Sequence, residues 1–285
     1  MTQETISLPI RHPLKLSGLH SHSLVRLLAN RRVQLSLAIL GPILFLTIFR
    51  PLLPLPGPLE TNLRAMTQPP SLEHVFGTDR MGRDLFSRTL AGVQISMFVG
   101  FAVACLALVV GLVMGTLAGF FGGVIDRVMM TITDIFLAFP SLLLAIGLVS
   151  VMGTGMVPVV LAISLSDVPR FIRLQRSMVL GLRTRAYIDA ARTVKASQFW
   201  LMTRHIVPNT IAPLLVAASI AAANAILVEA GLSFLGLGIM PPAPSLGNLI
   251  RDGQAYLEQA WWISTLPGAV ILLIAGVAGF LLNLT

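Results

Sequence analysis

Long apolar stretches separated by short polar segments dominate the pattern along this chain. Six of them approach the ~20 residues that an α-helix needs to cross a bilayer. They cover about 33–49, 93–120, 128–151, 157–172, 207–229 and 261–282. We therefore expect an all-α, polytopic membrane protein with six transmembrane helices. The fourth stretch is the least regular, because Asp167 and Pro169 lie in its last turns.

The distribution of positive charge predicts the orientation of these helices. Arginines precede the first apolar stretch, and the segment 170–209 carries eight cations against one acid, Asp189. Positive loops are retained on the cytoplasmic side. We therefore expect both termini and the 170–204 segment in the cytoplasm, and the 51–92 and 230–260 segments outside. The expected parts are an N-terminal arm (1–32), a first anchor (33–50), an external loop with an interfacial helix (51–92) and a five-helix core (93–285).

Composition agrees with this class of protein. The 285 residues are 55% hydrophobic and 11% charged, with a formal net charge of +8. Because the cations gather in the arm and in one loop, membrane topology explains them, and we expect no nucleic-acid partner. The single cysteine, Cys105, lies in an apolar stretch, so neither an intrachain disulfide nor a metal cluster is expected. The first apolar stretch has no Ala-x-Ala site and is expected to remain as an anchor.

The basic segment also predicts a short cytoplasmic helix. Residues 186–200 are rich in alanine and contain no helix breaker, and Pro208 then marks the first turn of the next apolar stretch. A helix that lies outside the membrane between two spans is suited to contact a partner protein.

This segment resembles the cytoplasmic coupling motif of ABC importer permeases. Asp189-Ala190-Ala191, Lys195, Ile206 and Pro208 match a motif written Glu-Ala-Ala, three residues, Gly, then Ile-x-Leu-Pro. Asp189 replaces the usual Glu, and Lys195 replaces the usual Gly. The flanking residues resemble the dipeptide, oligopeptide and nickel branch. The resemblance implies a type I ABC importer permease fold and an ATPase-coupling set: Arg185, Tyr187, Asp189, Ala190, Ala191, Lys195, Ala196, Ser197, Pro208 and Asn209.

Two further stretches are similar to the same branch. The first precedes the second apolar stretch and contains Gly77, Asp79, Gly82, Arg83 and Asp84. We interpret it as an interfacial helix, with contact to a substrate-delivery protein as the alternative. The second follows Glu229 and joins the last two apolar stretches. Its glycines favour a loop that dips into the outer mouth, and the candidate gate or pathway residues are Asp134, Glu229, Ser233, Phe234, Gly236 and Gly238.

Intramembrane carboxylates are costly, which is why Asp134 and Glu229 stand out. An arginine or a helix end near an interface is an equally good explanation of each. Gly111, Gly115 and Gly119 recur at four-residue spacing, which predicts a flat helix face for close packing.

The leading functional hypothesis is a transmembrane subunit of an ATP-driven peptide importer in the bacterial cytoplasmic membrane. The chain has no phosphate-binding loop of the Gly-x-x-x-x-Gly-Lys-[Ser/Thr] type, so no cofactor is expected in it. The resemblance implies ATP and magnesium on two separate ATPase subunits, a second related permease and an external binding protein. The alternatives are an ion-coupled secondary transporter, a membrane scaffold, and the same type of complex with nickel chelates or glutathione as cargo.

Overall fold

The computed structural model describes residues 31–282, so the expected N-terminal arm lies outside the described residues except for its last two positions. Within this range the chain is helical and forms no β-strand apart from an isolated bridge between Thr78 and Asp84, which confirms the all-α expectation. The α-helices are α2 (Arg31–Ile48), α3 (Leu85–Phe121), α4 (Gly123–Leu137), α5 (Ser141–Met152), α6 (Met156–Leu182), α7 (Ala186–Thr193), α8 (Gln198–Leu201), α9 (Val207–Phe234), α10 (Leu246–Gln254) and α11 (Trp262–Leu282).

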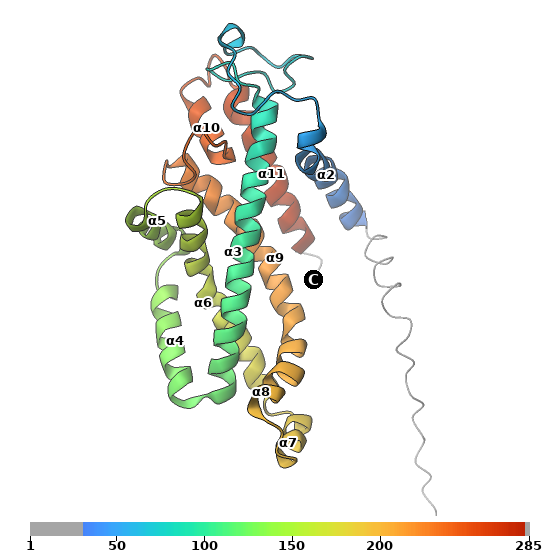
Figure 1. The fold of residues 1–285 in the computed structure, drawn as a ribbon, viewed down its shortest axis with the longest axis vertical. Coiled ribbons are helices and arrows are strands. Elements are labelled where there is room, and N and C mark those ends of the chain that lie inside the picture. Colours follow the sequence, from blue (N-terminus) through green and yellow to red (C-terminus); the bar gives the residue numbers. More distant parts are fainter. Residues whose placement is uncertain (1–30, 283–285) are drawn as a thin grey trace, which may run out of the picture.

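Figure 1 shows an elongated bundle in which α3 runs almost from one end to the other, beside α6 and α9. Helices α7 and α8 lie at the lower end, which we call the α7 end. Helix α10 and the segment between α2 and α3 lie at the upper end, which we call the α10 end. The segments expected inside and outside the cell therefore occupy opposite ends of the bundle.

Helices α3 and α6 pack closely because α3 presents three glycines. A Cβ atom on Gly115 would lie 2.6 Å from the Cβ of Gln175, and one on Gly119 would lie 2.8 Å from the Cβ of Val179. Gly111 faces Phe171 even more closely. Small residues matter here because lipid tails remove the hydrophobic drive for helices to associate, so van der Waals contact must supply it. The flat face predicted from the glycine spacing is a packing surface.

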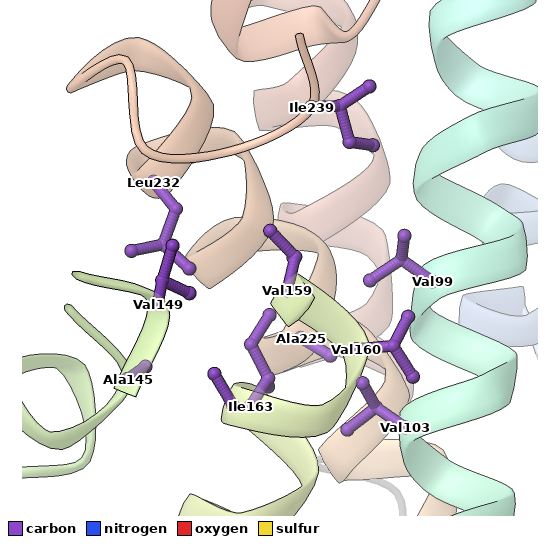
Figure 2. Packing of buried hydrophobic residues seen from close by; sticks show 11 residues of the cluster. Val99, Val103, Ala145, Val149, Val159, Val160, Ile163, Ala225, Leu232 and Ile239 are labelled. Atoms are coloured by element: carbon purple, nitrogen blue, oxygen red, sulfur yellow. The ribbon is translucent and has the colours of Figure 1, made fainter. Parts of the chain in front are cut away.

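A buried glutamine ties the same helices to α9. The Nε2 atom of Gln175 donates to the hydroxyl of Thr116 at 2.8 Å and to that of Thr210 at 3.0 Å. Towards the α10 end, a second contact region joins α3, α5, α6 and α9 through small and branched side chains, among them Val99, Val103, Val149, Val159 and Leu232 (Figure 2). Helices α3, α6 and α9 thus form one packed unit.

The third apolar stretch, expected to form one span over 128–151, is broken into two helices. Helices α4 and α5 meet at an angle of 91°. Pro140 stands directly before α5, where its ring disfavours a helical conformation for the preceding Phe139 and its nitrogen cannot donate to the helix ladder.

The fourth apolar stretch continues beyond its expected end at Ile172. Helix α6 includes Pro169 and runs to Leu182. Its arginines find acidic partners on α4: the Nη2 atom of Arg173 lies 2.5 Å from Asp134, and that of Arg176 lies 2.6 Å from Asp126. The basic residues therefore extend the helix instead of forming a loop, and the charges of Arg173 and Arg176 are paired with carboxylates of the adjacent helix.

Two helical runs within the described residues are long and apolar enough to cross a membrane, Leu85–Phe121 and Gln198–Phe234. The bent pair α4–α5 makes a third if it is counted as one span, and Trp262–Gly276 is a shorter apolar helix. The count of six spans therefore stays a prediction. Pro208 lies in the first turn of α9, as expected.

Candidate functional site

Helix α7 is held against the bundle by one buried side chain. Ile188 is fully buried in a cluster with Phe120 of α3, Val179 of α6, Leu201 of α8 and Ile206 of the π-helix Met202–Ile206. Because these neighbours come from α3, α6, α8 and the π-helix, α7 packs at the α7 end on an apolar surface that several helices form together.

The expected single helix over 186–200 is interrupted. Helix α7 ends at Thr193 and α8 begins only at Gln198, after the N-cap Ser197, whose hydroxyl accepts from the Trp200 amide at 3.2 Å. Between them Lys195 has a left-handed φ of +59°. The amide of Lys195 donates to the Arg192 carbonyl at 2.9 Å, and the next amide reaches back to the Ala191 carbonyl at 3.1 Å. This is a Schellman motif, in which the left-handed position favours glycine.

The left-handed conformation explains why the coupling motif of importer permeases has glycine at this position. A lysine there carries a steric cost of roughly 1 kcal/mol, because its Cβ approaches the backbone carbonyl. The Lys195 side chain is exposed, which is consistent with its tolerance.

We expect Lys195→Gly to raise the thermal unfolding midpoint of the purified protein, because glycine adopts positive φ without strain. Lys195→Ala is the matched control, since it removes the charge but keeps the Cβ. The midpoint should rise for glycine and not for alanine. Equal midpoints for the two variants would show that strain at this turn contributes nothing.

The remaining coupling candidates divide into an outer surface and a supporting layer. Ala191 and Ala196 are half-buried against the Ile188 cluster. The exposed candidates on the outer surface are Arg185, Tyr187, Asp189, Ala190, Lys195, Ser197, Pro208 and Asn209. The sequence did not point to Val194, Phe199 and Trp200, which are also exposed; Val194 is 78% and Phe199 72% accessible. We define the coupling surface as Tyr187, Ala190, Val194, Phe199 and Trp200.

Glu229 lies in a fully buried polar network at the α10 end. Its carboxylate accepts from the hydroxyl of Ser96 on α3 and from that of Ser233 on its own helix, each at 2.8 Å. The Ser233 hydroxyl in turn accepts from the Ile239 amide at 3.1 Å. The sequence did not predict a role for Ser96, because no local pattern around a serine indicates a hydrogen bond to an acid 133 positions away.

The loop after α9 packs onto this network. Gly238 is in close contact with Ser233, and Gly236 has a φ of +84°. Phe234 ends α9 and is half-buried. Asp134 is not part of this group, because its carboxylate pairs with Arg173 on α6 and is exposed. The gate candidates thus fall into a buried group around Glu229 and a separate α4–α6 ion pair.

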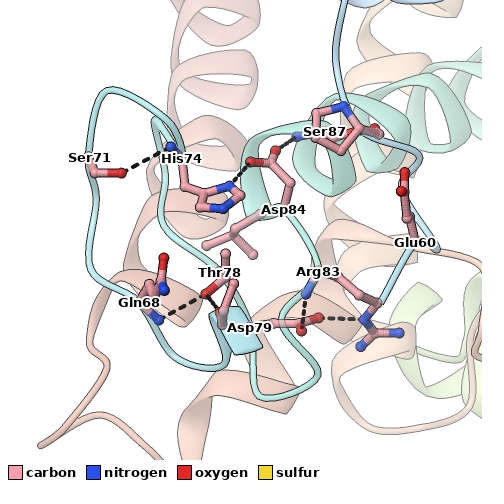
Figure 3. A network of polar contacts seen from close by, with 12 residues as sticks. Glu60, Gln68, Ser71, His74, Thr78, Asp79, Arg83, Asp84 and Ser87 are labelled. Carbon is pink, nitrogen blue, oxygen red and sulfur yellow. Dashed lines mark hydrogen bonds and ion pairs between the residues drawn. The ribbon is translucent and has the colours of Figure 1, made fainter. Parts of the chain in front are cut away.

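The expected external motif forms a second polar network, between α2 and α3 (Figure 3). Asp84 caps α3 by accepting from the Ser87 amide at 2.7 Å, and it lies 2.9 Å from the His74 ring nitrogen Nδ1. Asp79 accepts from the Arg83 Nε at 2.6 Å. Residues 85–92 form the first turns of α3, and residues 76–84 before them are not helical, so this motif forms no separate helix; its place at a membrane interface stays a prediction. These residues are held by the carboxylate cap and by burial within the protein.

The glycines of this motif allow close backbone contact. Gly77 has a φ of +74°, and a Cβ there would lie 2.8 Å from the Trp262 Nε1. Gly82 has a φ of +68° and contacts the Asn62 carbonyl. The motif residues thus shape the segment from within. The apolar side chains that this segment exposes are others: Leu63, Met66, Leu72, Val75 and Met81.

A polar cavity that the sequence did not point to lies between α5, α6 and α9. Its polar lining is Ser141, Ser166, Asp167, Arg170 and Asn224. Asp167 and Arg170 could have pointed to this cavity, because two charged residues within one apolar stretch are unusual. Asn224 gave no signal, because one amide in a helix is common. Among the described residues no group of His, Cys, Asp or Glu has the makings of a metal site.

The helical bundle, with two helices long and apolar enough to cross a bilayer among the described residues, is typical of a membrane protein. Comparison with known proteins identifies its family. The family of binding-protein-dependent transport system inner membrane components matches residues 107–284, and this chain belongs to it. A putative peptide transport system permease of Brucella abortus is 40% identical over 246 residues, which is 86% of this chain and 83% of that protein. The probable D,D-dipeptide transport system permease of Escherichia coli K12 is 40% identical over 84% of this chain and 80% of that protein.

Solved structures show the same fold. A chain of the inward-facing MetNI methionine ABC transporter superposes with a TM-score of 0.54 at 18% identity, over 67% of this chain and 91% of that chain. The expected type I ABC importer permease fold is therefore confirmed.

Proposed function

We propose that this chain is a transmembrane subunit of an ATP-driven importer that moves peptides across the bacterial inner membrane. Membership of a binding-protein-dependent permease family supports ATP-driven import. The names of the relatives from Brucella abortus and Escherichia coli support peptides as cargo, in preference to nickel chelates or glutathione.

The coupling surface is the observation that carries the coupling mechanism. Its apolar side chains are exposed at the end of the bundle that also presents Arg183, Arg185 and Arg192. An exposed apolar patch rimmed by charges is typical of a protein interface. We assign it as the contact with a separate ATPase subunit, which would bind ATP and magnesium.

The packing of Ile188 against several helices would let a movement of α7 reach the bundle. Because Ile188 packs against side chains from α3, α6 and the helical run that continues into α9, a displacement of α7 loads all three helices together. Closure of the ATPases on ATP would then tilt these helices from an inward-open to an outward-open arrangement.

The complete importer contains, in our proposal, a second related permease, two ATPase subunits and an external binding protein. This chain crosses the membrane six times with both termini in the cytoplasm, so the α10 end faces outward. The exposed apolar side chains around Leu63 and Leu72 then meet the binding protein, while the Glu229 network and the Gly236–Gly238 loop form the outer gate. Opening that gate would separate the Ser96 hydroxyl of α3 from the Glu229 carboxylate of α9, while the bond from Ser233 stays within α9.

One experiment tests orientation and cargo together. In a Cys105→Ser background, Ser197→Cys should react with an impermeant maleimide only from the cytoplasmic side, and Ser71→Cys only from outside; both positions are exposed. Vesicles that hold the complete complex should accumulate radiolabelled dipeptides only with ATP. Labelling of Ser197→Cys from outside contradicts the coupling assignment, and ATP-independent uptake driven by an ion gradient would support the secondary-transporter alternative.

A further inference from the structure

The cavity between α5, α6 and α9 lies midway along the bundle. Asp167 precedes the end of α6 by 15 residues, and Asn224 follows the start of α9 by 17. At 1.5 Å per residue these separations correspond to about 22 Å and about 25 Å from the α7 end. The two polar side chains therefore sit at a similar height, although they come from different helices.

Two adjoining cavities share the same charged lining. Their volumes are about 240 Å³ and 160 Å³, and both are lined by Asp167, Arg170 and Asn224. Together they reach the lower end of the size range of small-ligand pockets, about 300–1,000 Å³. The apolar part of the lining includes Ala145 and Ile163, which Figure 2 shows on α5 and α6, each one turn from the polar residues Ser141 and Asp167.

The charged groups of this cavity are loosely paired. Arg170 Nη1 lies 3.3 Å from the Asp167 carboxylate, and Arg170 Nη2 lies 3.5 Å from the Ser141 hydroxyl. An arginine has five N–H donors, so most of its hydrogen-bonding capacity is unused. The Asp167 side chain is 10% accessible while that of Arg170 is 54% accessible, which places a buried acid beside an open cation.

The neighbouring arginines of α6 differ from Arg170. Arg173 approaches Asp134 to 2.5 Å, and Arg176 binds both oxygens of Asp126. Those two pairs join α6 to α4. The Asp167–Arg170 ion pair lies within α6, and Arg170 reaches α5 through the 3.5 Å contact with Ser141. This long contact holds the two helices together less firmly than the two α4–α6 ion pairs do.

A bilayer restricts what such a group can face. Ionisable side chains at this depth face a water-filled pathway or the interior of a protein, since exposure to lipid is costly. Asn224 is exposed, and its side-chain amide makes no hydrogen bond to the part of the chain that the structure describes. An acid, a cation and a free amide around one apolar-walled cavity match the chemistry of a zwitterion with a peptide group between its charges.

We propose that this cavity is the station at which the transported peptide rests within the membrane, an inference that rests on the proposed peptide import. The Asp167 carboxylate holds the α-ammonium group, the Arg170 guanidinium holds the α-carboxylate, and the Asn224 amide bonds to the peptide group. Side chains of the peptide lie against Ala145 and Ile163. When the site is empty, Asp167 and Arg170 form an ion pair with each other. When a zwitterionic peptide binds, that ion pair is replaced by two, one at each end of the peptide.

The test uses the complete complex with its ATPases and binding protein in vesicles, and a radiolabelled mixture of alanyl dipeptides and tripeptides. Asp167→Asn and Arg170→Gln should each lower initial uptake by roughly tenfold or more, because each removes a charge-assisted bond. Arg170→Lys should retain most of the uptake. Arg127→Gln on α4 is the control, because it removes an exposed arginine that does not line the cavity, and it should transport like the wild type.

Site-directed labelling provides a readout that loss of stability does not mimic. In a Cys105→Ser background, the peptide mixture should slow maleimide labelling of Asn224→Cys during ATP turnover. It should not slow labelling of Ser219→Cys, which lies on the apolar groove between α3 and α9. The proposed peptide site is overturned if Asp167→Asn and Arg170→Gln both transport at the wild-type rate. It is equally overturned if the peptide mixture does not slow labelling of Asn224→Cys. Absence of peptide uptake by the wild-type complex overturns the proposed function itself.

Discussion

Replacing Ala190 with tryptophan is expected to abolish co-purification of the ATPase subunit and ATP-driven uptake, while the permease chain itself stays folded. Ala190 is exposed on the coupling surface, on the side of α7 opposite the buried Ile188. A well-packed interface has no free volume for an indole, and overpacking costs typically 1–3 kcal/mol. The measurement is ATPase recovery with the tagged permease, together with ATP hydrolysis in reconstituted complexes.

The choice of position matters, because the neighbouring alanine has another role. Ala191 is half-buried against the Ile188 cluster, so a tryptophan there would disturb the chain's own packing. Val124→Trp is the control: it adds the same indole at an exposed site on α4, near the same end of the bundle. ATPase recovery that survives Ala190→Trp would remove the coupling assignment, whatever the uptake rate.

Gly115→Leu is expected to have the largest effect on stability. A Cβ alone would lie 2.6 Å from the Gln175 Cβ and 2.7 Å from the Ile172 carbonyl oxygen, so α6 has to move away from α3. That movement also breaks the bonds from Gln175 to Thr116 and Thr210. We expect little folded complex in size-exclusion chromatography, and a loss of several kcal/mol follows from overpacking plus the broken polar contacts.

Gly147→Leu separates crowding from the general effect of replacing a helix glycine. Gly147 lies inside α5, and a Cβ there meets nothing within 4 Å. Its substitution should leave the elution profile and the uptake of the complex nearly unchanged. A similar loss for both variants would mean that close approach of α3 and α6 is not what the glycines provide.

Much of the organisation was predictable because the signals are local. The periodic glycines indicated a packing face, Pro208 the first turn of α9, and the coupling motif the segment that lies at the α7 end. One difference was also local, because Pro140 divides the third apolar stretch into two helices at 91°. Another arose where a neighbouring helix changed the outcome, because acids on α4 pair with arginines of α6 where the apolar stretch ends.

The external motif also combines features that the sequence predicts with features that depend on tertiary contacts. Its spacing identified a family resemblance, yet whether Asp79 and Asp84 face solvent or the interior depends on partners elsewhere. Arg83 and Arg88 contact Asp79, while His74 and the start of α3 contact Asp84. Those contacts make the motif a buried support and leave other side chains to form its surface.

The amino-acid sequence by itself determined the class of protein, the apolar stretches and the position of the coupling segment, because hydrophobicity, charge and turn chemistry act over short distances. Only the tertiary structure decided which polar groups meet. Ser96 and Glu229 are 133 positions apart, and Asp167 and Asn224 reach one cavity from different helices. Such pairings depend on how the helices pack against one another. The local sequence of one helix does not determine which other helix it packs against.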